Sequence, residues 1–156
     1  MLNAGLNKEK GDFFSEPQTY VTGSDEETIA LGIKIGKLLP ANSVVCLFGE
    51  LGAGKTTFIK GLAAGAAGWS GEQVSSPTFV YLNIYQGTKT IYHFDLYRLH
   101  DADEFISMGF DEYFFAGGIC CLEWSEKIEG ILPRGCIKIV MKHAGNNKRK
   151  ISIARL

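Results

Sequence analysis

The sequence predicts an α/β fold, a three-layer α/β/α sandwich in which helices lie on both faces of a mixed parallel and antiparallel sheet. Strand-like apolar runs alternate with helical runs along the chain, which is typical of sheets that contain parallel strands. Two further pairs of strand-like runs are joined by short polar turns, which indicates antiparallel hairpins. At 156 residues, the chain has the length of one domain with a core of its own.

The first half of the chain predicts two helices on either side of a buried strand. Ser24 and Glu27 form a capping-box pair, and apolar residues then recur at helical spacing as far as Pro40. A second helical run ends before Gly68, which suits a helix C-terminus. In order, we expect an edge strand, a helix, a strand buried on both faces and a helix, at residues 19–22, 25–39, 43–48 and 55–67.

The second half predicts two hairpins, one buried strand and several short helices. The turns at residues 87–89 and 145–149 each join two strand-like runs, and Gly109 suits the end of a short helix. The predicted strands are residues 80–86, 90–97, 119–124, 136–143 and 150–156. The predicted helical segments are residues 101–108, 111–115 and 125–129.

Composition and charge indicate a soluble globular protein. The chain is 46% hydrophobic and 21% charged, and its net charge of −1 gives no overall field that would attract nucleic acid or an anionic membrane. No apolar run approaches the roughly 20 residues of a membrane span, and no N-terminal leader segment is evident. We therefore expect a cytoplasmic protein with no membrane partner.

The N-terminal segment and the cysteines carry two further expectations. Residues 1–17 are polar and lack periodicity, so we predict a flexible N-terminal extension, with Phe13 and Phe14 able to dock on the domain formed by residues 18–156. The cysteines show no paired zinc-site spacing and lie mostly in apolar runs, so we predict buried, reduced thiols. They are Cys46, Cys120, Cys121 and Cys136.

A complete phosphate-binding loop lies between the buried strand and the second helix. Residues 49–56 match the pattern G-x-x-x-x-G-K-[ST] in full. Glycines let backbone N–H groups turn towards phosphates, Lys55 brings a positive charge to the β- and γ-phosphates, and the Thr56 hydroxyl can ligate magnesium. The motif therefore predicts a P-loop NTPase-like domain that binds ATP with Mg²⁺. The predicted nucleotide-binding residues here are Gly49, Glu50, Leu51, Gly52, Ala53, Gly54, Lys55, Thr56 and Thr57, and Lys55 is also expected to act in catalysis.

Two acidic residues are candidates to complete this site. A P-loop hydrolase needs an acid near magnesium and a group that orients water. Asp95 lies within an apolar, aromatic strand, and Glu123 ends an apolar strand as a Walker B acid does. We predict that both are metal-binding and catalytic residues. The alternatives are that Asp95 pairs with Arg98 or faces solvent, and that Glu123 caps the helix beginning at Ser125.

Residues 75–79 form a candidate switch loop. The hydroxyls of Ser76 and Thr78 could contact the γ-phosphate, while Pro77 limits the freedom of the loop. Both hydroxyl residues are therefore predicted to bind the nucleotide. The alternative is an ordinary turn rich in serine and proline.

Three further features are His93, Trp124 and the basic last hairpin, and the last two allow two interpretations each. His93 is most simply a buried, hydrogen-bonded histidine, and Trp124 either packs in the core or stacks near the nucleotide. The last hairpin is basic, which suits either a charged sheet edge that resists aggregation or a patch for RNA or an acidic partner. Its basic residues are Lys142, His143, Lys148, Arg149 and Lys150.

Several sequence strings, taken in order, resemble the TsaE family, the ATPase component of bacterial tRNA threonylcarbamoyladenosine synthesis. The similarity covers about residues 19–142. The P-loop alone is shared widely, whereas the strings around Asp95 and Glu123 are far more specific. The strings are residues 49–57, Ser-Pro-Thr-Phe at 76–79, Tyr-His-Phe-Asp-Leu-Tyr-Arg-Leu at 92–99, Glu-Trp-Ser-Glu-Lys at 123–127, and Leu-Pro at 132–133.

The resemblance implies a small P-loop ATPase with a mixed sheet between helices. It implies that Thr56 binds magnesium, that Asp95 and Glu123 belong to the metal and catalytic site, and that the segment around Ser24 and Asp25 lies near the nucleotide base. Members of this family act with two partner proteins, TsaD and TsaB, and reach tRNA indirectly through that complex. The tail before residue 18 and the basic hairpin depart from the compact family pattern.

Two other functions remain as alternatives. A small-molecule kinase usually has an arginine-rich lid, but the four arginines here are widely spaced. A nucleotide-sensing regulatory subunit without turnover would typically lack the two acids that this chain retains. Because no arginine apart from Arg98 is a candidate for a finger position, we expect slow hydrolysis by the protein alone and stimulation by its partners. The arginines are Arg98, Arg134, Arg149 and Arg155.

Overall fold

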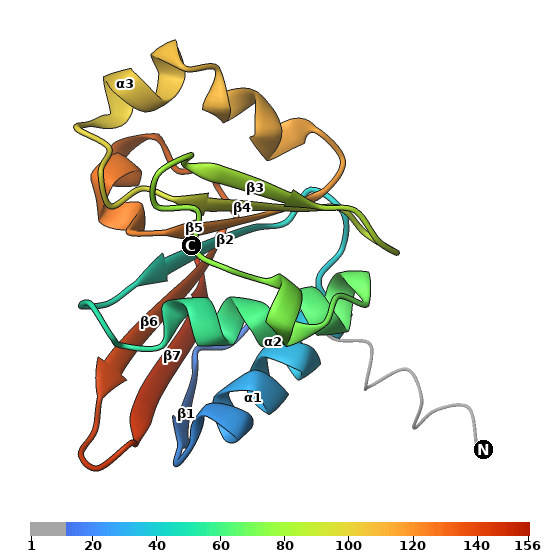
Figure 1. The fold of residues 1–156 in the computed structure, drawn as a ribbon, viewed down its shortest axis with the longest axis vertical. Coiled ribbons are helices and arrows are strands. Elements are labelled where there is room, and N and C mark those ends of the chain that lie inside the picture. Colours follow the sequence, from blue (N-terminus) through green and yellow to red (C-terminus); the bar gives the residue numbers. More distant parts are fainter. Residues whose placement is uncertain (1–11) are drawn as a thin grey trace.

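The computed structural model describes residues 12–156 as a seven-stranded mixed sheet flanked by helices (Figure 1). Residues 1–11, the larger part of the predicted extension, lie outside the described residues. The strand order is β1-β7-β6-β2-β5-β4-β3. The strands are β1 (Gln18–Thr22), β2 (Val44–Phe48), β3 (Leu82–Tyr85), β4 (Ile91–Asp95), β5 (Ile119–Glu123), β6 (Ile137–His143) and β7 (Arg149–Arg155).

The pairing confirms the predicted mixture of parallel and antiparallel strands. The neighbours β6, β2, β5 and β4 run parallel, whereas β3 pairs antiparallel with β4 and β7 pairs antiparallel with β6 and β1. β1 lies at the sheet edge, as predicted. The interpretation of the basic hairpin as a sheet edge is wrong, because β1 covers the outer side of β7.

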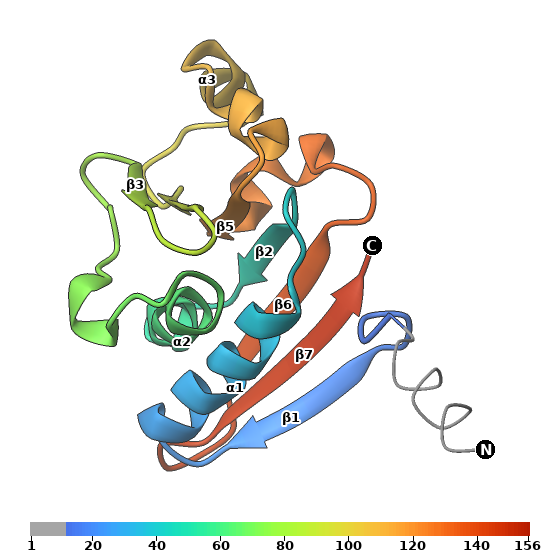
Figure 2. The same cartoon turned by 90° about the vertical axis from the view of Figure 1, so that its right-hand side faces the viewer.

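Helices lie on both faces of the sheet, which confirms the three-layer α/β/α fold. Figure 2 shows the long helix α1 (Asp25–Leu38) over the face formed by β7 and β1, with α2 (Lys55–Ala67) beside it. The short helix α3 (Ala102–Ser107) and the 3₁₀ segments η2 (Phe110–Phe115) and η3 (Ser125–Ile131) lie on the opposite side. A further 3₁₀ turn, η1 (Gly71–Gln73), follows α2.

Two apolar cores separate these layers. One lies under α1 and α2 and includes Phe58 from α2 and Ile151 from β7. The other lies under α3 and η2 and includes Phe94 and Leu122. Phe14 is 4% exposed in the first core and Phe13 packs beside it, so the predicted docking of these two rings is confirmed. The four cysteines are free and buried, also as predicted.

The helices α1 and α2 approach each other backbone to backbone. A Cβ placed on Gly61 would lie 2.1 Å from the carbonyl oxygen of Ile29, and one on Gly32 would lie 2.4 Å from that of Phe58. Side chains at these positions would therefore push the helices apart. This contact fixes α2, whose first turn belongs to the phosphate-binding loop.

The predicted elements agree with the observed ones to within about two residues, with a few local differences. Ser24 Oγ accepts a hydrogen bond from Glu27 N at 3.1 Å, but the Glu27 side chain accepts from Gly23 N rather than closing the predicted box on Ser24. Trp124 has a φ of 60°, so β5 ends one residue earlier than predicted. The segments after β5 and after α3 are 3₁₀ helices.

Candidate nucleotide-binding site

The phosphate-binding loop begins at the end of β2 and runs into α2. Gly49 has a φ of 155°, and a Cβ there would lie 2.5 Å from the carbonyl oxygen of Met141. Gly54, with a φ of 100°, forms the N-cap of α2 without a side-chain cap. The loop therefore needs glycine at both positions and leaves the N-terminal amides of α2 facing the site, where they can bind an anion.

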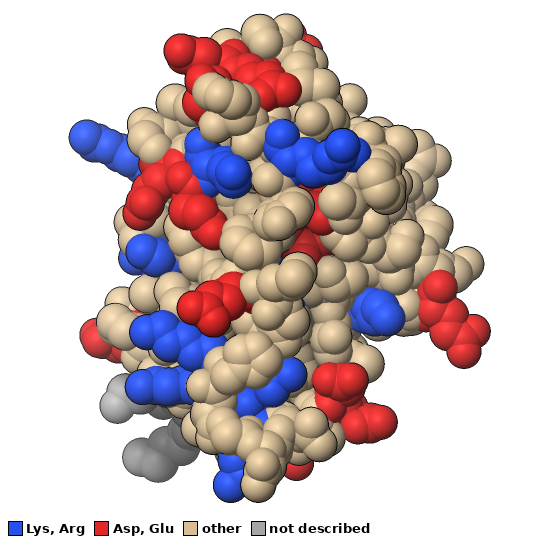
Figure 3. Space-filling view, turned by 60° about the vertical axis from the view of Figure 1, so that its left-hand side comes forward, with Lys and Arg blue, Asp and Glu red and all other residues tan. Residues whose placement is uncertain are grey.

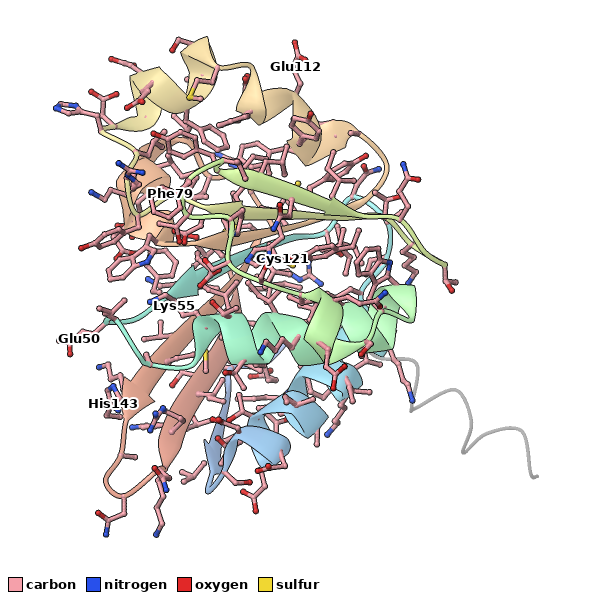
Figure 4. The ribbon with its side chains drawn as sticks, viewed as in Figure 1. Glu50, Lys55, Phe79, Glu112, Cys121 and His143 are labelled. Carbon is pink, nitrogen blue, oxygen red and sulfur yellow. The ribbon has the colours of Figure 1, made fainter. Side chains whose placement is uncertain are left out.

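Lys55 lies at the centre of this loop, at the start of α2 (Figure 4). The residue is 5% exposed, and its Nζ donates to the carbonyl oxygens of Gly49 and Glu50, the latter at 3.1 Å. The Nζ atom also lies 3.9 Å from the centroid of the Trp124 ring. Burial lowers the pKa of Lys55, while neighbouring carboxylates, Glu123 foremost, oppose that change. The ammonium group is thus partly desolvated and close to negative charge.

The two predicted acids lie side by side at the ends of neighbouring parallel strands. Asp95 ends β4, Glu123 ends β5, and the two are direct partners in the ladder. They are 4% and 3% exposed. Glu123 Oε1 accepts a hydrogen bond from Thr56 Oγ1 at 2.8 Å. Both alternatives are wrong, because Asp95 is buried with hydrogen bonds to other residues and Glu123 does not cap η3.

The loop of residues 75–79 is held against these acids by its hydroxyl groups. Ser76 Oγ contacts Asp95 Oδ2 and lies 3.1 Å from Glu123 Oε2. Thr78 Oγ1 donates to Asp95 Oδ2 at 2.9 Å. The side chain of Phe79, next in the chain, is 82% exposed and lies across from Lys55 in Figure 4. The loop therefore connects the acids to the molecular surface.

His93 extends this network behind Glu123. It is fully buried, as predicted, and its Nε2 lies 2.7 Å from Glu123 Oε2. Its Nδ1 lies 2.9 Å from the hydroxyl of Tyr85, which also donates to the carbonyl oxygen of Ser75 at 3.1 Å. His93 was not among the predicted site residues. Its position in the sequence could have indicated this contact, because side chains two residues apart on a strand lie on the same face and Asp95 follows His93 by two residues.

The loop, the acids and the hydroxyl groups line a single pocket of about 510 Å³. The pocket includes every predicted site residue except Gly49 and Glu50. Its lining residues are Asp25, Leu51, Gly52, Ala53, Gly54, Lys55, Thr56, Thr57, Ser76, Thr78, Asp95, Tyr97, Glu123, Trp124 and Arg149.

Arg149 is the pocket residue that sequence reasoning missed most completely. It begins β7, pairs with His143 in the ladder, and its Nη2 donates to the carbonyl oxygen of Gly52 at 3.3 Å. The strand order brings it there from 97 residues away, and its sequence neighbours gave no signal for the contact. Trp124 is half-buried, and it both packs against the second core and lines the pocket beside Lys55, so each of its two interpretations holds in part.

The donor set is suited to magnesium rather than to a softer metal. Thr56, Asp95 and Glu123 offer only oxygen atoms, and Mg²⁺ typically takes one or two carboxylates together with phosphate oxygens and water. Within residues 12–156, no group of three or more His, Cys, Asp or Glu side chains could hold a metal ion by itself. None of the helices described is long and apolar enough to cross a membrane.

Comparisons with known proteins find the same kind of protein by sequence and by structure. The family model described as "Threonylcarbamoyl adenosine biosynthesis protein TsaE" matches residues 22–151. The chain is 39% identical to the tRNA threonylcarbamoyladenosine biosynthesis protein TsaE of Treponema pallidum over 134 residues, 86% of this chain and 98% of that protein. It is 41% identical to the Bacillus subtilis protein of the same name over 132 residues, 84% of this chain and 81% of that protein.

The crystal structure of Bacillus subtilis YdiB has a similar fold. It superposes with a TM-score of 0.72 at 34% sequence identity, covering 88% of this chain and 84% of that one. The match to the family model covers most of the chain and includes the phosphate-binding loop, both strand-end acids and Arg149. The chain therefore belongs to the TsaE family.

Proposed function

We propose that this protein is the magnesium-dependent, ATP-hydrolysing component of the machinery that makes tRNA N6-threonylcarbamoyladenosine. The TsaE family has its role in tRNA threonylcarbamoyladenosine biosynthesis. The observation that carries the proposal is the convergence of Thr56 and two buried acids in the pocket of a complete P-loop. The resemblance to the family adds TsaD and TsaB as partners, and a cytoplasmic location suits four unbridged thiols.

In the proposed site, Lys55 and the amides of the loop hold the phosphates of ATP. The contacts of Lys55 with two loop carbonyl oxygens would give way to charge-assisted contacts with phosphate oxygens, which are stronger. Thr56 and Glu123 would hold Mg²⁺, because the Thr56 hydroxyl already contacts Glu123. Bound magnesium supplies positive charge that stabilises the negative phosphates.

Asp95 is assigned to the attacking water. Its carboxylate accepts hydrogen bonds from Ser76, from Thr78 and from the backbone amide of Tyr97, so its orientation is fixed. A fixed carboxylate beside the phosphates can orient a water molecule without itself moving. The hydroxyls of Ser76 and Thr78 would exchange part of their present contacts for the γ-phosphate.

The opposite wall of the pocket is assigned to the nucleoside. Asp25, at the start of α1, and Arg149, at the start of β7, line this wall beyond the phosphate loop. Arg149 can stack on a purine ring or contact an oxygen atom of the ribose. The nucleoside would then lie between α1 and the β6–β7 hairpin.

Replacing Lys55 by alanine tests the phosphate assignment. Lys55→Ala should abolish ATP turnover and severely weaken ATP binding, because it removes the charge that faces several phosphate oxygens. Lys60→Ala, in the same helix and outside the pocket, is the matched control. Nucleotide affinity measured by calorimetry and phosphate release measured by colorimetry should both be normal in the control. Unchanged affinity and turnover in a folded Lys55→Ala protein would refute the P-loop assignment.

A further inference from the structure

The charges of this chain are strongly segregated along its sequence. Seven of its 16 Lys and Arg residues lie within residues 130–156, and none of its 17 Asp and Glu residues does. Strands β1, β6 and β7, which form one half of the sheet, therefore contain no acidic residue. The net charge of the chain is −1, although residues 130–156 are strongly basic and the residues before them are acidic overall.

The alternation of the strands divides the basic residues between two faces of the sheet. His143 and Arg149 are ladder partners on the face that carries the phosphate-binding loop. Lys142 and Lys150, one residue away on each strand, are ladder partners and project from the opposite face, with Lys138 four residues further along β6. We call this opposite surface of β1, β7 and β6 the open face.

No helix of residues 12–156 packs on the open face. The core under α3, η2 and η3 takes its strand residues from β2, β4 and β5 and none from β1, β6 or β7. The helices α1 and α2 cover the other side of these three strands (Figure 2). Figure 3 shows Lys and Arg side chains over both the upper and the lower part of the molecule, with Asp and Glu side chains between them.

Two lysines of the open face, Lys142 and Lys150, form no ion pair with the other residues described. Lys142 and Lys150 are exposed and directly opposite each other, an arrangement that destabilises a sheet through like-charge repulsion. The nearest ion pair is that of Lys138, whose Nζ lies 4.0 Å from Glu129 Oε1. A bound polyanion would relieve the repulsion.

We propose that the open face binds the phosphate backbone of RNA. Exposed lysines along one sheet face suit backbone contacts, which need positive charge and carry no sequence information. On these three strands the positions beside the lysines hold Val140, Ser152 and Ala154, which are not the aromatic or arginine anchors typical of protein interfaces. The aromatic ring at the border of the face, Phe48 of β2, lies 4.7 Å from Lys138 Nζ. RNA therefore fits this surface better than an acidic protein does.

The choice of tRNA as the RNA rests on the proposed function. The nucleotide pocket and the open face lie on opposite sides of the β6–β7 hairpin, and none of the three lysines lines the pocket. ATP and tRNA therefore bind to different side chains and can occupy the protein together. The tRNA contact is independent of base sequence and sensitive to salt.

The test measures the affinity for unmodified tRNA transcript by fluorescence anisotropy over a series of salt concentrations. The double variant Lys142→Gln/Lys150→Gln should lower the slope of log affinity against log salt by about two, one for each lost phosphate contact. The control, Lys34→Gln/Lys37→Gln, removes two exposed lysines from α1 and should keep the wild-type slope. Thermal unfolding should show the double variant to be at least as stable as the wild type, because it loses a like-charge pair.

Three results would overturn the inference. One is a wild-type protein that does not bind tRNA, and another is a double variant with an unchanged salt slope. The third is a double variant that binds tRNA normally but loses association with TsaD and TsaB, which would make the open face a protein surface. ATP binding, measured on the same proteins, separates this inference from the proposed function. Failure to bind ATP would refute the proposed function, while the salt dependence of tRNA affinity would still test whether the open face binds RNA.

Discussion

At the scale of single residues, the proposed mechanism assigns one acid to the metal and the other to the water. Glu123 contacts Thr56, whereas Asp95 is held by Ser76, Thr78 and the amide of Tyr97. These different neighbours distinguish two carboxylates that the sequence presents as equivalent strand-end acids.

We predict that Glu123→Gln and Asp95→Asn each slow hydrolysis by more than about tenfold, for different reasons. Glu123→Gln should need more Mg²⁺ to reach half-maximal ATP binding, because it loses a metal ligand. Asp95→Asn should bind Mg-ATP normally and fail in turnover. Magnesium titrations of nucleotide affinity and of phosphate release separate the two, and wild-type turnover in both variants would contradict the assignment.

The buried pair of His93 and Tyr85 should position Glu123. Its hydrogen bonds reach Glu123 Oε2 from behind, and groups that orient a ligand in this way typically affect metal affinity by about 10- to 100-fold. We predict that His93→Phe weakens apparent Mg²⁺ affinity in the presence of ATP within that range, and that Tyr85→Phe has a smaller effect of the same sign.

Tyr92→Phe is the control for both changes, because it removes a hydroxyl from the opposite face of β4. The apparent magnesium affinity can be measured without turnover, from the change in fluorescence of a bound fluorescent ATP analogue as Mg²⁺ is added. Equal magnesium affinity in His93→Phe and wild type would show that Glu123 is oriented without the histidine.

The sequence alone predicts most of the residues that line the pocket, and it misses those that reach the pocket through the fold. The P-loop, Asp95 and Glu123 are marked by spacing and by acids within apolar strands. Arg149 is marked by nothing local, because its approach to Gly52 depends on β6 pairing with β2 and β7 pairing with β6. Long-range register is the physical information that a local pattern lacks.

At the scale of elements, the close packing of α1 on α2 determines where the first turn of α2 lies. We predict that Gly61→Ala lowers the free energy of unfolding by about 1–3 kcal/mol. This loss is expected even though alanine has a higher helix propensity than glycine. The added Cβ would lie 2.1 Å from a backbone carbonyl oxygen of α1, which cannot rotate away as a side chain can.

Gly130→Ala is the matched control, because a Cβ there meets no atom within 4 Å. Urea unfolding of the two variants gives the difference in the free energy of unfolding. A Gly61→Ala protein as stable as the control would mean that the helices can separate at little cost.

The cap of α3 gives a pH-dependent prediction. The pKa of Asp101 is lowered by hydrogen bonds, first from the backbone amide of Glu104 and then from His100. Because the folded pKa lies below the unfolded one, the cap stabilises the fold above the unfolded pKa and loses this effect as pH falls through the folded pKa. The loss in thermal midpoint in Asp101→Ala should thus be largest at neutral pH and shrink as the pH falls below 3.8, the ordinary pKa value for an aspartate.

Thermal unfolding followed by circular dichroism across this pH range measures the effect. Glu112→Ala, an exposed acid on η2, serves as the control for the loss of one negative charge. A stability difference that did not change with pH would rule out the ionised cap.

Periodicity predicts the long elements well and the short ones less well. The limits of α1 and α2 follow from a cap, a proline and a glycine, and they agree with the structure. The segments at 110–115 and 125–131 are 3₁₀ helices, because one or two turns between strands are shaped by packing of side chains such as Phe114 and Ile128 rather than by helix propensity.

At the scale of the whole molecule, the nucleotide site is connected to an exposed apolar surface. Thr78 contacts Asp95, while its neighbours Phe79 and Val80 are 82% and 63% exposed, and the Arg98 guanidinium lies 4.9 Å from the Phe79 ring. A loop that rearranges around the γ-phosphate would change this surface. A partner that binds it could then distinguish the ATP state from the empty state.

We predict that the protein alone hydrolyses ATP slowly, and that TsaD and TsaB together accelerate it. By reciprocity, the factor by which ATP changes the affinity for the partner pair must equal the factor by which the pair changes ATP affinity. Calorimetry tests that equality by measuring ATP affinity with and without the partner pair, and partner affinity with and without ATP. Phe79→Ala should reduce both factors without altering ATP binding to the isolated protein. Fast turnover that the partners do not change would argue for a free-standing enzyme.

The pairing of the first strand with the last has a consequence for how the protein is made. Gln18 is the ladder partner of Ile153, and the carbonyl oxygen of Met141 lies against Gly49. During synthesis, a ribosome releases the P-loop long before it releases β6 and β7, and contacts so distant in sequence form late because the intervening chain must first be ordered. A nascent chain that ends before residue 137 should therefore have little affinity for ATP, and this protein should acquire its nucleotide only after β6 and β7 have been synthesised.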